Sequence, residues 1–536
     1  MSKELEIALP PYEQLQPPTP STRRRPLVIV GLLAIIGAVI HQLAHSALLR
    51  SARFGPDLHP YAHASDAELD WSWLSYTKMC PALSLIGNDE YTARRDQLAE
   101  LLRGEHGDSW GAYVSEPRFA FFSLASLASL ASLASLTFTS SPRPGSANGL
   151  HYVNLTQSDW YLSERPWLVV ITPSSSSNSS SHLSILTPAF ELSRSQRLPF
   201  ALTPSEFASV SWVTWQEADD PYAVLLQHLE RLRAEDAVEG DWSIEVEENV
   251  RQFIAAGLAG AAQQLKKTPT VGLARLAVRE QRMRKTEAEL AIQRCITLEA
   301  LRAVRKHLRI GMTEKEGEAL ITNALHAGGL TDIGVITLFG DNAALPHASA
   351  SATRRLKKGE FALFDVDGSL FGYQSDFTRT MLPDPPSSRC HGSRSLSPEW
   401  PSARAQKIWT TVHLAQDTAL AKLVTGNSSQ PVHAAEVDEA ARSVIASEGW
   451  GQYFTHRLGH GIGLEVHEQP YLNAGSVNQV LQPGETFSNE PGIYIERAVD
   501  PDGVGIGVRL EDMVHKTETG WELLSGSGLA RSPWDP

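Results

Sequence analysis

The alternation of apolar and polar residues divides the first half of the chain into predicted helices and strands. Helical spacing of apolar positions occurs over Asp89–Arg103, Asp219–Ala234 and Ser243–Leu265. Two short apolar runs, Trp110–Pro117 and Trp167–Pro173, are typical of buried strands. This mixture predicts a small α/β domain in the first half of the chain.

We assign this first domain to residues 60–265 and expect two low-complexity insertions in it, at 121–147 and 174–181. The first insertion contains a Ser-Leu-Ala repeat, whose period matches neither a helix face nor a strand face. The second is a run of serines, which is typical of a flexible surface loop. Neither insertion carries residues suited to chemistry.

A second domain is predicted at 278–521, because the pattern changes between residues 266 and 284. Val278–Leu308 has the spacing of one long helix, and Gly311–Glu314 ends that helix and caps the next one. A loop at 383–403, rich in proline and serine, interrupts this domain.

Residues Phe361–Thr380 predict a β-hairpin with two aspartates on one face. A turn centred between Leu370 and Phe371 places Asp365 directly opposite Asp376. Directly opposed residues have Cβ atoms about 4.5–5.5 Å apart, a distance at which like charges are destabilising. Two half-buried carboxylates in this arrangement need a cation between them. Two solvated aspartates on an exposed hairpin are the alternative.

The N-terminal segment predicts a membrane anchor. A Pro-rich tail at 1–25 ends in three arginines, and the apolar run after it predicts a transmembrane signal anchor at 26–49. Basic residues ahead of the run favour a cytoplasmic N-terminus and a single-pass protein whose body is lumenal or extracellular. Three sequons, at Asn154, Asn178 and Asn427, would then be open to glycosylation. A cleaved signal peptide of a secreted protein, a buried core helix, and the tail of a cytoplasmic protein are the alternatives.

Composition narrows the class of protein. The chain has 536 residues, of which 42% are hydrophobic and 20% charged, as in globular proteins of more than one domain. Its formal net charge of -14 argues against nucleic acid as a partner. Cys80, Cys295 and Cys390 are too widely spaced for a zinc finger and too few for a disulfide framework.

The stretch Thr455–Glu468, THRLGHGIGLEVHE, concentrates residues suited to a metal centre. It contains His456, His460 and His467, with glycines between them. Histidine is the commonest metal ligand and changes its charge near neutral pH. Glycine lets the backbone approach a ligand closely. An isolated histidine is usually structural, but three in one glycine-rich run favour a functional site.

Two further acidic side chains follow strand-like segments downstream. Glu490 ends the apolar run of TFSNEPGIY, and Glu511 follows the alternating residues of GVRLED. With the two hairpin aspartates and one histidine they supply four carboxylates and an imidazole, enough negative charge for two divalent cations. A ligand set dominated by oxygen favours Mn²⁺ and accepts Co²⁺ or Zn²⁺ less selectively.

The order of these motifs resembles a known family. HASA, the aspartate pair, THRLGHGIG, HEQP, NEPG and RLED follow one another as in the pita-bread-fold metallopeptidases, most closely the Xaa-Pro aminopeptidases and prolidases. The resemblance extends from about Val278 to Trp521. It implies an α+β fold, with a creatinase/aminopeptidase-like pita-bread catalytic domain preceded by a smaller mixed α/β domain.

The resemblance also implies a role for each candidate residue. The ligands of two divalent cations would be Asp365, Asp376, His460, Glu490 and Glu511, with Glu511 bridging. The catalytic residues would be His347, His456, His467 and Glu490, with Glu490 accepting the proton of a metal-activated water. The substrate would contact His347, His467 and Arg509. One residue departs from the family pattern: Asp367 replaces a small residue, adds negative charge beside the cations and so bears on metal affinity.

The reaction implied is hydrolysis of the bond that precedes proline, with release of the N-terminal residue of Xaa-Pro peptides. The expected partners are such peptides and, through the anchor, a membrane, and a homodimer is left open. A prolidase, which cleaves only Xaa-Pro dipeptides, is the alternative enzyme. A catalytically inactive pita-bread module used for binding is the more remote alternative.

Overall fold

The computed structural model describes most of the chain beyond residue 68. The described residues are 69–103, 109–116, 147–156, 159–160, 163–175, 180–238, 240–295, 297–383, 401–424, 431–526 and 528–536. The predicted anchor at 26–49 and most of the three predicted insertions lie outside them. Within the described ranges, no helix is long and apolar enough to cross a membrane.

Residues 110–273 build a six-stranded mixed sheet in the order β4-β3-β2-β1-β5-β6. Strands β1 and β2 pair antiparallel, as do β2 and β3, and the remaining three pairs are parallel. The strands are β1 (Trp110–Ser115), β2 (Leu168–Pro173), β3 (Ser181–Pro188), β4 (Ser211–Trp215), β5 (Trp242–Val246) and β6 (Thr270–Leu273).

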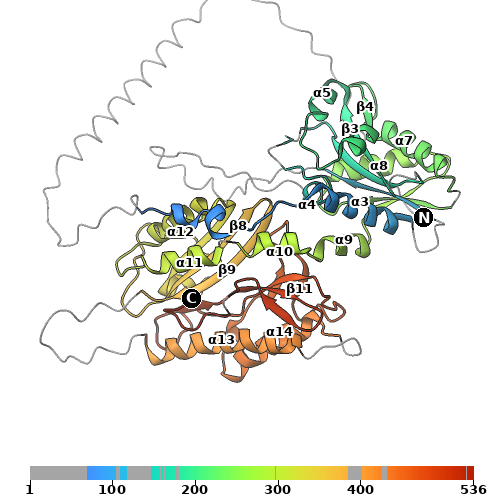
Figure 1. Ribbon diagram of the computed structural model, residues 1–536. Coiled ribbons are helices and arrows are strands. Elements are labelled where there is room, and N and C mark those ends of the chain that lie inside the picture. Colours follow the sequence, from blue (N-terminus) through green and yellow to red (C-terminus); the bar gives the residue numbers. More distant parts are fainter. Residues whose placement is uncertain are drawn as a thin grey trace, which may run out of the picture. The chain divides into compact units, whose positions relative to one another are not determined.

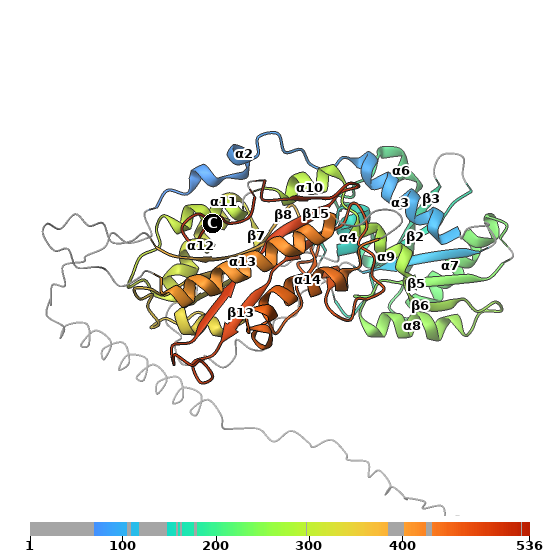
Figure 2. The same ribbon diagram turned by 90° about the horizontal axis from the view of Figure 1, so that it is seen from below.

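Helices cover both faces of this sheet, α3 on one side and α7 and α8 on the other (Figure 2). Side chains of β2 alternate between two cores: Leu168 and Val170 pack with α7 and α8, while Val169 and Ile171 pack with α3. The helices of this part are α3 (Asn88–Arg103), α4 (Ala147–Val153), α5 (Leu192–Ser195), α6 (Pro204–Ser209), α7 (Pro221–Glu235) and α8 (Gln252–Ala262).

Three further sheets form the part of the chain after residue 330 (Figure 1). A three-stranded sheet contains β7 (Thr331–Phe339), β8 (Ala362–Leu370) and β9 (Tyr373–Met381). A five-stranded sheet, ordered β11-β10-β12-β15-β16, contains β10 (Gly459–Gly461), β11 (Glu468–Leu472), β12 (Thr486–Asn489), β15 (Asp512–Lys516) and β16 (Trp521–Leu523). A two-stranded sheet pairs β13 (Gly492–Ile495) with β14 (Ile506–Arg509).

Two hydrophobic cores hold these sheets against helices. One joins α11 (Thr297–Arg305) and α12 (Glu314–Gly328) to the three-stranded sheet. The other joins α13 (Ala403–Val424) and α14 (Ala434–Ser447) to strands β12 to β15. Thr313 caps α12 and exchanges hydrogen bonds with Glu316, which confirms the predicted helix start.

The predicted hairpin is confirmed, but its register is two residues away from our prediction. Asp367 pairs with Asp376, and Asp365 pairs with Thr378. The turn consists of Phe371 and Gly372, which both have positive φ, rather than being centred one residue earlier. Because side chains alternate with a period of two, the error leaves both predicted aspartates on one face but makes them diagonal neighbours.

Two helix predictions were wrong. Ser243–Leu265 begins with strand β5, which pairs with β1 and β6, before α8 starts. Val278–Leu308 is broken into α9 (Leu276–Met283), α10 (Glu287–Gln293) and α11. The first break has a local cause, since Arg284 is extended and Thr286 begins a new helix as its N-cap.

A disulfide joins Cys80 to Cys295 across a sequence separation of 215 residues. Cys80 follows the short helix α2 (Tyr76–Met79), and Cys295 lies just after α10. The segment around Cys80 packs against the core of α11 and α12. The cysteine spacing alone did not predict this bond.

Candidate metal centre and active site

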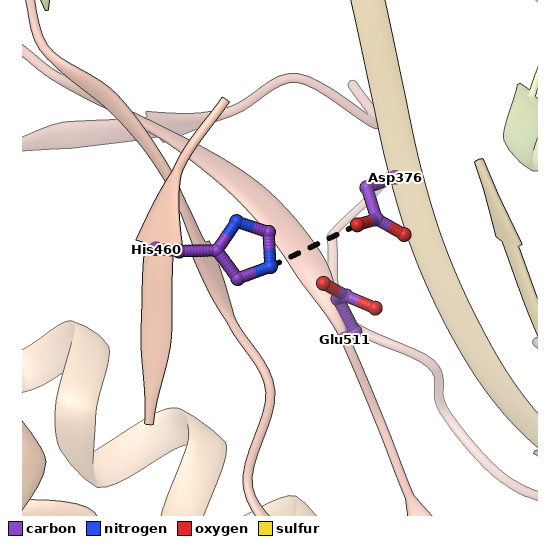
Figure 3. Close-up of side chains that lie close together, drawn as sticks. All are labelled: Asp376, His460 and Glu511. Carbon is purple, nitrogen blue, oxygen red and sulfur yellow. Dashed lines mark ion pairs between the residues drawn. The ribbon is translucent and has the colours of Figure 1, made fainter. Parts of the chain in front are cut away.

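Asp376, His460 and Glu511 converge from three segments far apart in the sequence (Figure 3). Each offers one ligand atom, and these atoms lie within 4.8 Å of one another. Asp376 lies on β9, His460 on the short strand β10, and Glu511 in the break between β14 and β15. The sequence predicts Glu511 after a strand-like segment, and in the structure it lies between β14 and β15, outside both strands.

Burial and neighbouring carboxylates destabilise the charges of both carboxylates in this cluster. Burial, followed by the charges of Glu511 and Asp365, raises the pKa of Asp376 well above its ordinary value. Burial, followed by Glu490 and Asp365, does the same to the pKa of Glu511. Asp376 Oδ1 and Glu511 Oε1 are buried without a hydrogen-bond partner. Such oxygens are suited to a divalent cation. A bound cation would offset both the cost of burying these charges and the repulsion between neighbouring carboxylates.

His460 is oriented as a metal ligand. Its Nδ1 lies 3.2 Å from the carbonyl oxygen of Gly461, to which it can donate a hydrogen bond. That bond leaves Nε2 facing the carboxylates, 3.8 Å from Asp376 Oδ2 and 3.2 Å from Glu490 Oε1. Metal-binding histidines generally donate their second ring N–H in this way. The residues present therefore fit a divalent cation.

Glu490 adjoins the cluster and is held as a carboxylate. Burial works to raise its pKa, but the hydrogen bond from a protonated Nε2 of His460 and its charge, with His456 and Arg509, lower the pKa to about 2. Binding of a cation by His460 would remove that proton from Nε2. The Ser488 hydroxyl donates to Glu490 Oε1 over 3.2 Å. Glu490 is therefore ionised at neutral pH.

Asp365 connects to His456 through a buried chain of hydrogen bonds. Arg509 Nη2 contacts Asp365 Oδ2 at 2.5 Å, and Arg509 Nη1 donates to the Tyr494 hydroxyl over 2.8 Å. That hydroxyl lies 2.8 Å from His456 Nε2. Arg509 Nε also donates to Thr378, whose hydroxyl donates to Glu511 Oε2 over 2.7 Å. One arginine therefore orients two candidate ligands and one candidate catalytic histidine.

The three predicted non-ligand histidines lie around the cluster on segments outside the strands. His347 and His456 line a cavity of about 450 Å³ together with Leu345 and Pro346. The ring of His467 lies edge-to-face on that of His460, with centroids 4.2 Å apart. Burial and the neighbouring His460 lower the pKa of His467 to about 4, so its imidazole is neutral at neutral pH.

Sequence reasoning missed Tyr494 and Thr378. Thr378 is two residues after Asp376, so the alternation of β9 could have placed it on the same face. Tyr494 reaches Arg509 across Gly492, where a Cβ would lie 2.4 Å from the tyrosine hydroxyl. No sequence pattern indicates that approach.

Asp367 lies directly opposite Asp376 and is one of the charges that raise the pKa of Asp376. Its carboxylate rests on the backbone of Gly334, where a Cβ would lie 1.9 Å from Oδ2. The predicted extra negative charge therefore acts on the site, while the carboxylate itself rests against β7.

Comparisons with known proteins agree with this geometry. A model of metallopeptidase family M24 matches residues 293–518. An uncharacterized peptidase of Schizosaccharomyces pombe is 37% identical over 393 residues, which cover 72% of this chain and 77% of the relative. The chain belongs to metallopeptidase family M24.

Solved structures extend the M24 comparison to both parts of the chain. The dipeptidase PepE from Mycobacterium ulcerans is 26% identical with a TM-score of 0.60, over 83% of this chain and 98% of that one. The X-Pro aminopeptidase from Thermotoga maritima is 26% identical with a TM-score of 0.52, over 72% and 93%. These likenesses confirm the predicted α+β pita-bread fold, and this M24 chain is a metallo-exopeptidase.

Proposed function

We propose that this M24 peptidase is a dinuclear-metal-dependent Xaa-Pro aminopeptidase that releases the N-terminal residue of peptides with proline in second position. The proposal is supported mainly by the convergence of Asp376, His460 and Glu511 next to Glu490. One buried carboxylate oxygen of Asp376 and one of Glu511 have no hydrogen-bond partner. The X-Pro aminopeptidase among the similar structures supports the substrate class.

We expect all five ligand candidates to bind a pair of divalent cations. Asp365 and Asp376 would hold the two cations, His460 would bind one of them, and Glu490 and Glu511 would complete the site. We expect Mn²⁺, since carboxylate oxygens dominate the donors, with Co²⁺ or Zn²⁺ as substitutes. When bound, the cations would polarise the scissile carbonyl and make hydroxide available at neutral pH.

Side chains of the protein accept the proton of the attacking water and bind the substrate. Glu490, whose carboxylate lies 3.2 Å from His460 Nε2, accepts the proton of the attacking water. The neutral imidazole of His467, with His347, donates an N–H to the oxygen that becomes negative in the tetrahedral intermediate. Arg509 holds Asp365 in place and, through Tyr494, orients His456.

Hydrolysis assays on purified full-length protein test this function. With Mn²⁺, Co²⁺ or Zn²⁺ supplied, we expect cleavage of longer peptides that begin Xaa-Pro and none of matched peptides with alanine in second position. Equal cleavage of both series would overturn the Xaa-Pro assignment.

A prolidase is the second candidate, favoured by the likeness to a dipeptidase over 98% of that chain's length. Cleavage restricted to Xaa-Pro dipeptides supports it against the aminopeptidase. Absence of hydrolysis with every metal and substrate would support an inactive binding module, although all five ligand candidates are present.

We further propose that the catalytic part works in an oxidising compartment beyond a membrane, as a lumenal or extracellular enzyme. Disulfides such as Cys80–Cys295 persist mainly in such compartments. Asn154, the first residue of a sequon, is exposed, so an oligosaccharide could be attached there. An unchanged gel mobility after N-glycan removal, together with release from membranes by carbonate, would contradict this localisation and its anchor.

A further inference from the structure

His467 lies at the end of an irregular bend, residues 463–467, which enters strand β11 at Glu468. A bend of this kind has few ladder hydrogen bonds, so its shape depends on side-chain anchors. Gly463 N donates to the carbonyl of Glu465, and the carbonyl of Gly463 accepts from Gln374 N on β9. These two hydrogen bonds fix the start of the bend beside the hairpin β8–β9. They do not fix its end, where His467 lies.

The end of the bend is held by the pairing of Glu468 with Gly461 on β10 and by a buried ion pair between Glu468 and Lys285. Their side chains are only 2% and 1% exposed, and Lys285 Nζ lies 2.7 Å from Glu468 Oε1. The ammonium also donates to the carbonyl oxygens of Arg282 and Met283, over 2.9 and 3.0 Å. All three donors of Lys285 are therefore used, which gives this cation one defined position.

Two further charged residues extend this pair into a cluster of four, Arg282, Lys285, Glu465 and Glu468. Arg282 Nη2 lies 2.5 Å from Glu465 Oε2, and Arg282 Nε lies 3.5 Å from Glu468 Oε2. Burial works against the charge of Arg282, but Glu468 and Glu465 raise its pKa and keep it charged. Asn249, in the turn after β5, donates to Glu465 Oε1 over 2.7 Å.

Glycine is required where this cluster touches the bend. A Cβ on Gly463 would lie 2.4 Å from Glu468 Oε1 and 2.8 Å from Lys285 Cε. The ion pair therefore rests directly on the backbone of the bend, and Glu468 Oε2 accepts from Glu465 N over 3.4 Å. The carboxylate of Glu468 thus holds the segment immediately before it.

We propose that Glu468, paired with Lys285, is a positioning residue that holds His467 against the metal centre for catalysis. The proposal rests on the proposed function, in which His467 contacts the substrate. Since misplacement by about 1 Å can cost about a hundredfold in rate, we expect Glu468→Gln to lower kcat at least about tenfold. Metal content should be unchanged, because no ligand candidate is altered.

A double-mutant cycle with His467→Ala tests the proposal. If Glu468 acts through His467, Glu468→Gln should change kcat less than about twofold in the His467→Ala background, because coupled residues are not additive. The same loss of kcat in both backgrounds would overturn the proposal.

A second pair of variants separates positioning from stability. Lys285→Met with Glu468→Gln removes both charges, which should restore the stability lost in either single variant. It should not restore kcat. Glu116→Gln is the matched control, since it neutralises a buried carboxylate paired with Arg251 in the six-stranded sheet part. It should cost stability and leave kcat unchanged. Recovery of kcat along with stability in the double variant would mean a purely structural role.

A crystal structure of Glu468→Gln gives a result that does not need activity. We expect the His467 ring to leave its edge-to-face contact with His460. An unmoved ring overturns the positioning role, whereas inactivity of the unmodified enzyme on every substrate overturns only the proposed function.

Discussion

The two sides of the candidate site are built by different means. The hairpin β8–β9 places Asp365 and Asp376 through nine residue pairs in unbroken register, with every residue of β9 buried. The bend 463–467 places His467 with no ladder of its own. Its end is held by the buried ion pair of Glu468 and Lys285.

The difference shows how each kind of group can be positioned. Mutually repelling carboxylates need a rigid backbone, because their own charges drive them apart unless a cation is present. A neutral histidine exerts no such force, so side-chain anchors are enough to hold it. Substitutions in the hairpin should therefore reduce the amount of bound metal. Substitutions in the bend should lower turnover and leave the metal bound.

The largest effect should come from Asp376→Asn on the hairpin side. A neutral amide is a poor replacement for a carboxylate ligand, so bound metal should be lost. Turnover should fall by more than the roughly 10–100-fold cost of losing an outer-shell partner. Elemental analysis and an activity assay measure both. Asp341→Asn is the control, since Asp341 pairs with Arg354 and Arg497 outside the site. Full metal content in Asp376→Asn would refute the ligand assignment.

His467→Ala should remove the catalytic contribution of the bend without affecting the hairpin. We expect turnover to fall by about 10²–10³-fold, the usual cost of removing one hydrogen-bond donor to the developing oxyanion, with the metals retained. His413→Ala is a matched control, because His413 stacks on Trp409 of α13 instead of on a ligand candidate. Loss of metal together with activity would show that the two sides are not independent.

Tyr494→Phe should give a smaller effect, because it removes one hydroxyl from the chain between Arg509 and His456. We expect turnover to fall about tenfold, as for loss of an outer-shell partner, with metal content nearly unchanged. Steady-state kinetics measure this, and Tyr453→Phe serves as a control outside that chain. Unchanged kinetics would mean that Asp365 and His456 are oriented without Tyr494.

The smallest effect concerns the pH dependence of stability beside Arg284, between α9 and α10. Burial raises the pKa of Glu485 from about 4.5 to about 7, and its segment forms a bridge to Arg284. Between these pH values the folded state keeps a proton that the unfolded state has lost. The contribution of Glu485 to the free energy of unfolding is therefore complete below pH 4.5 and declines as the pH rises toward 7.

Urea unfolding at fixed metal concentration measures this decline. From pH 5 to 8 we expect the free energy of unfolding of the unmodified protein to fall by on the order of 3 kcal/mol more than that of Glu485→Gln, which cannot ionise. Equal losses in the two proteins would contradict the raised pKa.

The sequence by itself determined the local features of this protein. Period-two alternation placed Asp365 and Asp376 on one face of a hairpin, and the capping pattern at Thr313 predicted the start of α12. These predictions held because they depend on residues close together in the chain. The motif order also indicated the family, since each motif is short and contiguous.

Tertiary structure decided the features that depend on distant contacts. Positive φ at Phe371, a residue with no turn preference, shifted the hairpin register by two residues. Pairing with β1 and β6 made residues 243–246 part of a strand, although they begin a segment predicted to be helical. The Cys80–Cys295 disulfide and the contact of Tyr494 with Arg509 join residues that no local pattern relates. Propensity acts within a few residues, whereas packing and charge act between whichever segments the fold brings together.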